Sequence, residues 1–341
     1  MNVLITGAGL IGSNAARRCL LAIAGHAVCV ALLLGWAMQV PAVLGQPYPF
    51  PRRLFLFGAA YAVGVLISYL QKHVQRAVGL IPLAALLAAL EKFSVDTIVH
   101  TAGLIGSRVQ ENSYTGATNN ILGTINILEA ARLRKIRRVV YVSTFGVYDR
   151  GKINDSVIRE THTIGGHNLY ATTKICSEHL VHAYASMYSL DTIIIRPGGV
   201  FGRGFYVGGS TVGKVMRDLA LAIIKGDPIT IDAKTYGPNE YVYGKDVGRT
   251  LLLACQAQTP KQRIYNAGTG VVHTPEDLAA VVRELAPRTE VKISGTSGAD
   301  ESRNIPMDIS VSKAELGYAP KFMLKDALRD YMEDLWSEQK N

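Results

Sequence analysis

The start of the chain carries the pattern that most constrains its fold, because an apolar strand runs into a glycine-rich turn and then into a helical segment. The strand is expected at residues 2–6, the turn at residues 7–12 and the helix at residues 13–23. In a G-x-G-x-x-G turn the glycines permit a tight bend, close approach of the backbone to a pyrophosphate, and packing of helix on strand. The dinucleotide contacts predicted from this pattern are Gly7, Gly9, Leu10, Ile11 and Gly12.

Strand and helix patterns alternate along the following part of the chain. Apolar runs at residues 96–103, 138–143 and 191–196 predict buried strands, and apolar residues at helical spacing over residues 119–132 predict a helix. A further helix is expected at residues 82–93. Alternation of this kind is typical of a parallel sheet covered by helices on both faces. The predicted fold is therefore α/β, a doubly wound parallel Rossmann sheet with a smaller C-terminal α/β substrate lobe.

The length of 341 residues accommodates two parts. We expect residues 1–204 to form the dinucleotide-binding domain and residues 205–341 to form the substrate lobe, with a segment at about residues 241–270 returning to the sheet. The elements expected within the lobe are a helix at residues 211–225, a turn and strand at residues 226–232, and a helix at residues 246–253 with Asp246 as its N-cap.

Tyr170 and Lys174 lie four residues apart, so they share one face of a helix. A phenol loses its proton near pH 10, and a nearby cation such as Lys174 favours the phenolate that acid/base chemistry needs. A hydroxyl from Ser143 or Thr144, at the end of a strand, could hold a substrate oxygen in line for proton transfer. Together these residues predict a site that moves a proton on a carbinol, whereas the isolated Y-x-x-x-K pattern is also typical of a solvated helix face.

The ordered motifs of this chain resemble those of the extended short-chain dehydrogenase/reductases, the group of NAD-dependent sugar epimerases and dehydratases. The resemblance covers everything except about residues 25–80. The motifs that carry it are the N-terminal glycine turn, HTAG at 100–103, NILGTINILEAAR at 120–132, YVSTFGVYD at 141–149, YATTK at 170–174, RPGGVFG at 196–202, YVYGKD at 241–246, YNAGTG at 265–270 and AELGYAP at 314–320.

The resemblance implies roles for particular residues. Tyr170 would be the acid/base, Lys174 would lower its pKa and hold the nicotinamide ribose, and Thr144 with Ser143 would contact the reacting oxygen. The further cofactor contacts implied by the resemblance are Thr101, Ala102, Gly103, Asn120, Pro197 and Val200. Arg203 and Lys214 are substrate-binding candidates. Members of the group often form homodimers through the helix that carries the lysine, so a homodimer is expected.

The cofactor is expected to be NAD, with NADP as the alternative. A dinucleotide-binding second strand should end in Asp or Glu to accept hydrogen bonds from the adenine ribose. The matching strand at residues 26–32 ends in leucine, and the acidic residue expected before the helix at 82–93 is missing at residues 79–81. The basis for NAD selection is therefore not visible. Arg52 or Arg53 could meet an NADP phosphate, but no spacing places them there.

Residues 25–80 depart from the rest of the chain. No Asp or Glu occurs before residue 91, while six Lys and Arg residues supply most of the formal net charge of +9. Three interpretations stay open. The uncharged runs at 27–45 and 54–70 fit a membrane hairpin, although only just in length. The stretch could instead be a buried or membrane-surface insertion or an oligomer contact, or a segment of altered reading frame. Membrane contact through residues 27–70 is not the favoured interpretation.

The substrate is expected to be a small sugar or sugar-like molecule. Nucleotide-sugar enzymes of the group carry an arginine just before the segment at 240–243, where it binds a diphosphate, and this chain has residues 237–239 (GPN) there. Asn239 cannot replace the charge of that arginine. We therefore keep three hypotheses: an epimerase or dehydratase, a dehydrogenase or reductase of a non-nucleotide hydroxy or carbonyl compound, and a non-catalytic Rossmann sensor or scaffold.

Composition bounds the remaining function classes. The cysteines at 19, 29, 176 and 255 form no C-x-x-C motif, which indicates a reducing compartment and no structural zinc. His179 and His182 lack neighbouring ligands at metal-binding spacing, so no metal is predicted. The basic residues do not cluster with aromatic residues as in a nucleic-acid interface. A cytoplasmic location is expected, because a cofactor-binding strand occupies the place of a secretory leader.

Overall fold

The computed structural model describes residues 2–6, 83–203, 210–296 and 305–339. The chain divides into two units, residues 1–16 with 79–341 and residues 17–78. The second unit lies outside the described residues. So do the predicted glycine turn, the helix at 13–23, the strand at 26–32 and the stretch that received three interpretations. The fold below is that of the first unit.

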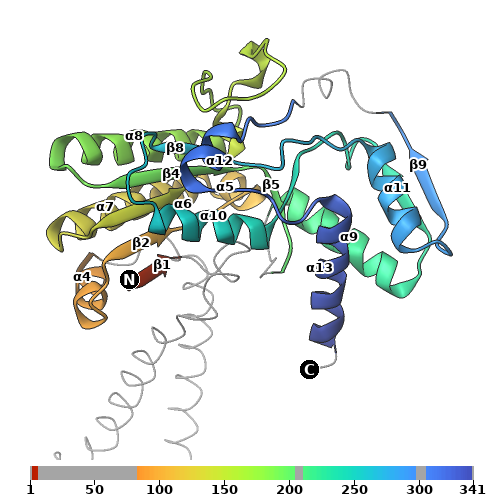
Figure 1. The fold of residues 1–341 in the computed structure, drawn as a ribbon, viewed down its shortest axis with the longest axis horizontal. Coiled ribbons are helices and arrows are strands. Elements are labelled where there is room, and N and C mark those ends of the chain that lie inside the picture. The colour runs from red at the N-terminus through yellow and green to blue at the C-terminus, as the bar shows by residue number, and fades with distance from the viewer. Residues whose placement is uncertain (1, 7–82, 204–209, 297–304, 340–341) are drawn as a thin grey trace, which may run out of the picture. The chain divides into compact units, whose positions relative to one another are not determined.

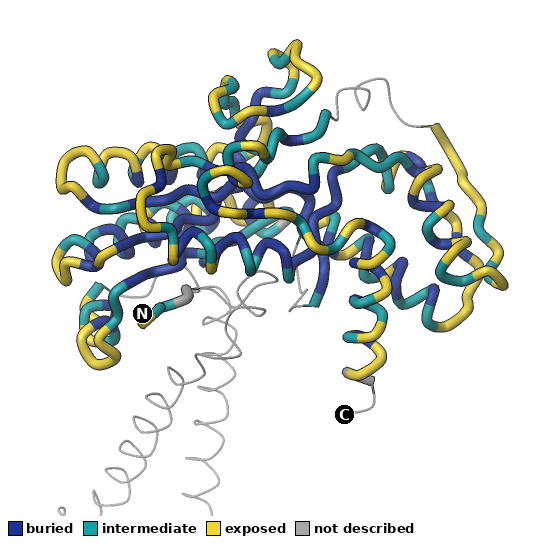
Figure 2. Tube along the Cα trace, in the orientation of Figure 1, coloured by how far each residue is buried: buried dark blue, intermediate teal, exposed yellow. Residues whose placement is uncertain are grey.

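A five-stranded parallel sheet forms the centre of this unit (Figure 1). Its strands, in spatial order, are β1 (Val3–Thr6), β2 (Thr97–His100), β3 (Arg138–Val142), β4 (Thr192–Pro197) and β8 (Ile264–Ala267). All four pairings are parallel, for example with Val139 opposite Thr192. β2, β3 and β4 are buried along their whole length (Figure 2), as expected for strands covered on both faces. The predicted α/β fold with a parallel sheet is confirmed.

Helices cover both faces of the sheet because alternate strand residues point in opposite directions. On one face, Ile98, Tyr141 and Ile194 belong to an apolar core with residues of α4 (Leu83–Lys92), α7 (Gly123–Leu133) and α8 (Leu169–Tyr188). On the other face, Val99, Val140 and Ile195 pack with residues of α10 (Gly244–Gln256) and α12 (Ser310–Leu316). The helix that carries Tyr170 and Lys174 therefore lies directly on the sheet.

Short helical segments follow β2 and β3. They are α5 (Ser107–Glu111), α6 (Ser113–Ala117), the π-helix η1 (Thr118–Leu122), and the 3₁₀ turns η2 (Phe145–Val147) and η3 (Arg150–Lys152). The predicted helix at 119–132 is thus divided between η1 and α7, which begins at Gly123. The turn η2 begins directly after Thr144 and gives that residue its position.

The remaining elements pack around a second apolar core that includes Phe201, Met216 and Tyr331. They are β5 (Gly199–Phe201) paired with β7 (Tyr241–Tyr243), β6 (Ile229–Asp232) paired with β9 (Val291–Ser294), and the helices α9 (Thr211–Lys225), α11 (Pro275–Leu285) and α13 (Leu324–Gln339). The predicted helix at 211–225 and the strand within 226–232 are confirmed. The domain boundary at residue 204 stays a prediction.

Asp246 is not the N-cap of its helix, contrary to the prediction. The helix α10 begins at Gly244, directly after β7, with Tyr243 at the N-cap position. The Asp246 carboxylate is buried and accepts hydrogen bonds from the backbone N–H groups of Lys321 and Phe322. Its partners lie 75 and 76 residues away in sequence, where no local pattern could reveal them. The role of Asp246 is structural, as the sequence also indicated.

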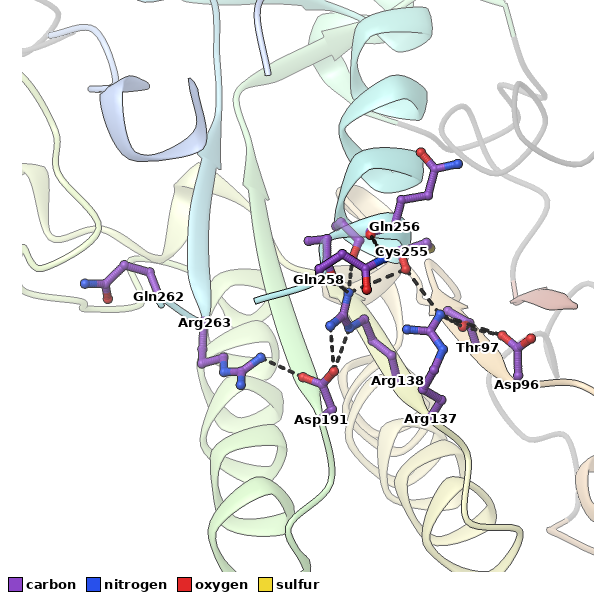
Figure 3. A network of polar contacts seen from close by, with 12 residues as sticks. Asp96, Thr97, Arg137, Arg138, Asp191, Cys255, Gln256, Gln258, Gln262 and Arg263 are labelled. Carbon is purple, nitrogen blue, oxygen red and sulfur yellow. Dashed lines mark hydrogen bonds and ion pairs between the residues drawn. The ribbon is translucent and has the colours of Figure 1, made fainter. Parts of the chain in front are cut away.

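An ion-pair network joins the amino ends of β3 and β4 (Figure 3). The Arg138 side chain is only 3% exposed and contacts Asp191 Oδ2 through Nε at 2.8 Å and Nη2 at 2.7 Å. Arg138 Nη1 also donates to the carbonyl oxygens of Ala254 and Ala257, while Arg263 holds the other oxygen of Asp191 at 2.6 Å. The network ties α10 to the sheet, at the end of the strands opposite to the one that carries Ser143.

Arg138→Met is expected to destabilise the protein by about 2 to 4 kcal/mol, since it leaves two carbonyls and a carboxylate without their buried donor. Thermal melting and urea unfolding measure this loss. The matched control is Arg132→Met, which removes a surface pair with Glu129 and should change stability far less, because exposed ion pairs contribute little. Equal melting temperatures for the two variants would contradict the structural role of the Arg138 network.

The described part of the chain has neither a membrane-spanning helix nor a cluster of metal ligands. None of the helices in the described ranges is both long and apolar enough to cross a bilayer. Among the same residues, no group of three or more His, Cys, Asp or Glu side chains is arranged to hold a metal ion. Residues 27–70, for which membrane contact was the less favoured interpretation, lie outside the described residues.

Candidate active site

The helix α8 is capped by Asn168, whose side chain accepts a hydrogen bond from the backbone N–H of Ala171 at 2.9 Å. Asparagine is a favoured N-cap residue because its side chain satisfies a donor that the helix leaves free. This cap puts Tyr170 in the first turn of α8 and Lys174 one turn later. The capped start of α8 therefore fixes where the side chains of Tyr170 and Lys174 lie along the sheet.

Lys174 is only 4% exposed. Its Nζ donates to the Val142 carbonyl at 2.8 Å and lies 4.8 Å from the centre of the Tyr141 ring and 6.0 Å from that of Tyr170. Burial lowers the pKa of Lys174 to about 8, and the negative charge of Glu178 opposes this decrease. The ammonium group is thus held in a dry position next to Tyr170, where it costs free energy to keep charged.

Thr144 and Tyr170 meet at the end of β3. The Thr144 hydroxyl accepts a hydrogen bond from the backbone N–H of Gly146 at 3.1 Å, which caps η2 and orients the side chain. Burial raises the pKa of Tyr170, and a hydrogen bond with Thr144 lowers it. Two residues that the sequence predicted as catalytic, 26 positions apart, are therefore brought into contact.

Ser143 differs from its neighbour Thr144. Its backbone N–H donates to the Ile195 carbonyl at 2.8 Å, so it continues the ladder between β3 and β4. Its hydroxyl is buried and has no hydrogen-bond partner among the described residues. The sequence treated the two hydroxyls as equivalent, whereas the structure pairs Thr144 with Tyr170 and leaves Ser143 available to a ligand or a water molecule.

Gly103, shortly after β2, places no side chain next to Lys174. A Cβ atom on Gly103 would lie 3.1 Å from Asn120 Oδ1 and 3.8 Å from Lys174 Nζ. Asn120 is buried, accepts from the backbone N–H of Leu104 at 2.7 Å, and donates to the Leu104 carbonyl and to Thr173. Asn120 therefore fixes the segment after β2 against α8, and its amide already makes three hydrogen bonds to two residues.

The remaining predicted site residues fall into different parts of the fold. Pro197 ends β4 and Val200 lies in β5, both in the segment that follows the sheet. Arg203 is half-buried two residues beyond β5. Lys214 is exposed on α9, where it forms an ion pair with Asp218 at 2.7 Å. Residues 7–12 lie outside the described residues, so the predicted pyrophosphate contacts stay a prediction.

The described part of the site fits a ribose with free hydroxyl groups. Lys174 has three N–H donors, and its one hydrogen bond to the described residues goes to the Val142 carbonyl. The Ser143 hydroxyl is unpartnered within the same residues, and Gly103 offers no side chain that would block approach. A polyhydroxylated ligand at the carboxyl ends of β2 and β3 would meet these donors and acceptors. This is the edge at which ligands bind open parallel sheets.

Sequence reasoning missed two buried carboxylates near this edge. Glu178 lies on α8, one turn beyond Lys174, and contacts Arg196 of β4. Glu240 accepts backbone N–H groups from two separate segments, Thr269 and Gly270 at 2.6 and 2.8 Å and Met307 at 2.7 Å. The spacing of Tyr170, Lys174 and Glu178 was a signal that the third residue shares the catalytic face. Glu240 has no comparable local signal.

Comparison with known proteins identifies the family. Residues 71–268, more than half of the chain, match the model of the NAD dependent epimerase/dehydratase family. The chain belongs to the NAD dependent epimerase/dehydratase family. The match includes β2 to β8 and therefore Thr144, Tyr170 and Lys174, and it begins beyond the N-terminal glycine turn. The predicted family, enzyme class and NAD cofactor are confirmed at this level.

Relatives within the epimerase/dehydratase family cover most of the chain. A putative UDP-glucose 4-epimerase of Methanocaldococcus jannaschii is 28% identical over 254 residues, which are 72% of this chain and 78% of that protein. The UDP-glucose 4-epimerase of Mycolicibacterium smegmatis is 26% identical over 252 residues, 73% of this chain and 79% of its own. The crystal structure of the Thermus thermophilus UDP-glucose 4-epimerase in complex with NAD has a TM-score of 0.60 at 27% identity and covers 74% of this chain and 81% of that one.

Proposed function

We propose that this chain is an NAD-dependent epimerase or dehydratase that acts at a carbinol carbon of a sugar. The observation that carries the proposal is the buried Lys174 ammonium 6.0 Å from the centre of the Tyr170 ring, with the Thr144 side chain lowering the pKa of the same phenol. This arrangement holds a proton acceptor, a partner for the reacting oxygen and a cation at one edge of the sheet. Sugar-epimerase relatives on the same fold support the substrate class.

The residues of the chain then perform the proton half of the reaction. Tyr170 takes the hydroxyl proton of the substrate as the C–O bond gains double-bond character, and Thr144 holds the same oxygen in line. Lys174 would favour the phenolate by its positive charge and would donate to the ribose of the cofactor. NAD, when bound, supplies the acceptor for the hydride that leaves the carbinol carbon. The protonated Tyr170 returns its proton when the carbonyl is reduced again.

The roles of individual residues follow from this proposal. The proposed catalytic residues are Tyr170, Lys174, Thr144 and Ser143. The proposed cofactor contacts are Gly7, Gly9, Leu10, Ile11, Gly12, Thr101, Ala102, Gly103, Asn120, Tyr170, Lys174, Pro197 and Val200. The proposed substrate contacts are Ser143, Thr144, Arg203 and Lys214. Residues 1–204 would form the dinucleotide-binding domain and residues 205–341 the substrate lobe, and the enzyme would work in the cytoplasm.

A homodimer is the proposed oligomeric state. α7 and α8 pack against each other and expose the apolar side chains of Leu133, Met187 and Tyr188. A second copy of the chain would remove these side chains from water. Light scattering of the purified protein should give twice the chain mass, and Met187→Glu should shift it towards the monomer. A monomeric mass for the wild-type protein at micromolar concentration would contradict the proposal.

A dehydrogenase or reductase of a non-nucleotide substrate is the second candidate function. One observation favours it: Asn239, a neutral residue, stands where nucleotide-sugar enzymes are expected to carry a diphosphate-binding arginine. In the structure, the Asn239 side chain packs closely on Gly199, where an added Cβ would come within 2.8 Å of Asn239 Nδ2. The position is thus filled by a compact amide without charge.

The test is a panel of nucleotide-sugars and free sugars, incubated with NAD and with NADP and followed by product analysis. A changed sugar without net reduction of cofactor is the expected result for an epimerase or dehydratase. Net reduction of cofactor on a free sugar or hydroxy compound would favour the second candidate. No conversion of any substrate, in protein that binds neither cofactor, would contradict both.

A further inference from the structure

Glu178 is the third residue on the face of α8 that carries Tyr170 and Lys174, at successive four-residue steps. Its carboxylate contacts Arg196, which lies in β4 beneath the helix. Arg196 Nε donates to Oε1 at 3.0 Å and Nη2 to Oε2 at 2.6 Å, and the two side chains are 3% and 2% exposed. Two parallel bonds between planar groups fix both distance and orientation. The pair therefore defines how α8 is rotated and how far it is shifted along the sheet.

Arg196 also contacts the segment that leads away from Thr144. Its guanidinium carbon lies 4.8 Å from the centre of the Tyr148 ring, and Tyr148 immediately follows the turn η2 that begins after Thr144. The Tyr148 hydroxyl is anchored in turn by a 2.6 Å hydrogen bond to Asn266 Oδ1 in β8. A single arginine thus joins the helix of Tyr170 to the turn of Thr144.

A buried ion pair stabilises packing less effectively than apolar side chains of the same volume. Removing two charges from water costs several kcal/mol per ion, and apolar residues of similar volume often stabilise a core as well or better. What the pair adds is a fixed geometry and a negative charge behind Lys174. Proton transfer requires donor and acceptor at hydrogen-bond distance, and a displacement of about 1 Å can cost about a hundredfold in rate. The fixed geometry of the Glu178–Arg196 pair thus suits a site in which Tyr170 and Thr144 must be held at a set distance from each other.

The elements packed around Lys174 and Glu178 carry further titratable groups, and their charge states decide which charges act on this pair. His100 on β2 is neutral, since burial and then the charge of Lys174 lower its pKa to about 3. Burial raises the pKa of Tyr141 on β3, so that side chain is neutral as well. The other titratable groups with influence here are Tyr148 before η3, Glu160 beside Arg196, and His182 on α8. Glu178 is thus the negative charge on the α8 face that carries Lys174.

We propose that Glu178 is a positioning residue of the reaction: held by Arg196, it fixes α8 on the sheet and so sets Tyr170 against Thr144. The assignment rests on the proposed function, because it concerns the proton transfer by Tyr170. Removing the carboxylate charge takes away the negative charge that raises the pKa of Lys174 and leaves Arg196 without its ion-pair partner. Lys174 then loses its proton at a lower pH, and Tyr170 loses the cation that favours its phenolate.

The experiment compares Glu178→Gln, Glu178→Asp and the control Asp191→Asn across pH with NAD saturating. Glu178→Gln keeps the shape of the side chain and should lower kcat about tenfold to a hundredfold with KM within about threefold. The decline of kcat at high pH should begin about one pH unit lower than in the wild-type enzyme. Glu178→Asp retains the charge, so its decline should begin at the wild-type pH although its kcat is reduced.

Asp191→Asn disrupts the ion-pair network at the other end of the sheet and serves as the matched control. It should lower the melting temperature and leave the pH profile of kcat unchanged. A Glu178→Gln enzyme that loses rate only in proportion to its folded fraction, with a wild-type pH profile, would overturn the assignment. So would a Glu178→Asp enzyme whose profile shifts like that of Glu178→Gln. Absence of turnover in the wild-type enzyme would contradict the proposed function instead, and this assignment with it.

Discussion

Tyr170→Phe is expected to lower kcat by about a hundredfold to ten-thousandfold, the range that a positioned general acid/base contributes. The substitution removes one oxygen atom and keeps the ring, so the packing of α8 on the sheet should not change. Thr144 keeps its hydrogen bond from the Gly146 backbone N–H, but the substrate proton then has no acceptor. Turnover on the substrate identified in the panel and NAD affinity measured by titration together check this result.

The matched control for this substitution is Tyr188→Phe, at the exposed end of the same helix. It makes the same chemical change away from the site and should leave kcat within about twofold, as surface substitutions do. NAD affinity should stay within a few-fold of the wild-type value in both variants. A Tyr170→Phe enzyme that keeps its rate would remove Tyr170 from the mechanism.

Lys174→Met is expected to abolish most of the activity and, at the same time, to stabilise the protein without ligand. Burial lowers the pKa of Lys174 from 10.5 to about 8, and each pKa unit corresponds to about 1.4 kcal/mol between the two protonation states. Keeping the ammonium charged in the folded state therefore costs up to about 3 kcal/mol at neutral pH. Lost contacts with Val142 and Tyr141 offset part of the gain, so the expected net stabilisation is about 1 to 2 kcal/mol.

The sign of this effect depends on pH. Below about pH 8 Lys174 is charged in both states, and the folded state bears the full cost. Between about pH 8 and 10.5 the unfolded chain binds more protons than the folded protein, so wild-type stability rises with pH through this window. The advantage of Lys174→Met over the wild type should shrink across the same window. A methionine at this position would thus show the exchange of stability for function that is frequent at active sites.

Thermal melting of the two proteins at several pH values measures this difference. Lys292→Met, which removes an exposed lysine paired with Glu290, is the control and should change stability by no more than about 0.5 kcal/mol at any pH. A Lys174→Met protein that is less stable than the wild type at neutral pH would mean that the ammonium is held more favourably than its burial indicates. The same result would leave the role of Lys174 in turnover to the kinetic measurement.

Local patterns were sufficient for the elements that are built from contiguous residues. The apolar run at 138–143 predicted β3 and the helical spacing at 211–225 predicted α9, because both depend on neighbours along the chain. The sequence also predicted that a hydroxyl from Ser143 or Thr144 lies beside Tyr170, since strand ends and a helix start place their side chains at one edge of a parallel sheet. These predictions depend on the spacing of neighbouring residues, which can be read from the sequence.

Contacts between residues far apart in the sequence could not be predicted from local patterns. Glu178 and Arg196 are 18 residues apart on a helix and a strand, and their pairing depends on how those elements pack. Glu240 accepts backbone N–H groups from residues 29, 30 and 67 positions away, which no side-chain pattern records. The difference between Ser143 and Thr144 depends on where β3 ends and η2 begins. A shift of one residue would have exchanged their roles.

The most direct test of the account follows an isotope from the substrate. A sugar converted by the enzyme, with deuterium at the reacting carbinol carbon, is mixed with a stoichiometric amount of enzyme and NAD, and nicotinamide absorbance and mass are recorded over one turnover. We expect transient reduction with the label on the nicotinamide in the wild-type enzyme, and binding without reduction in Tyr170→Phe. Product formation with the label retained throughout on the sugar, or label transfer at the wild-type rate in Tyr170→Phe, would contradict the central claim.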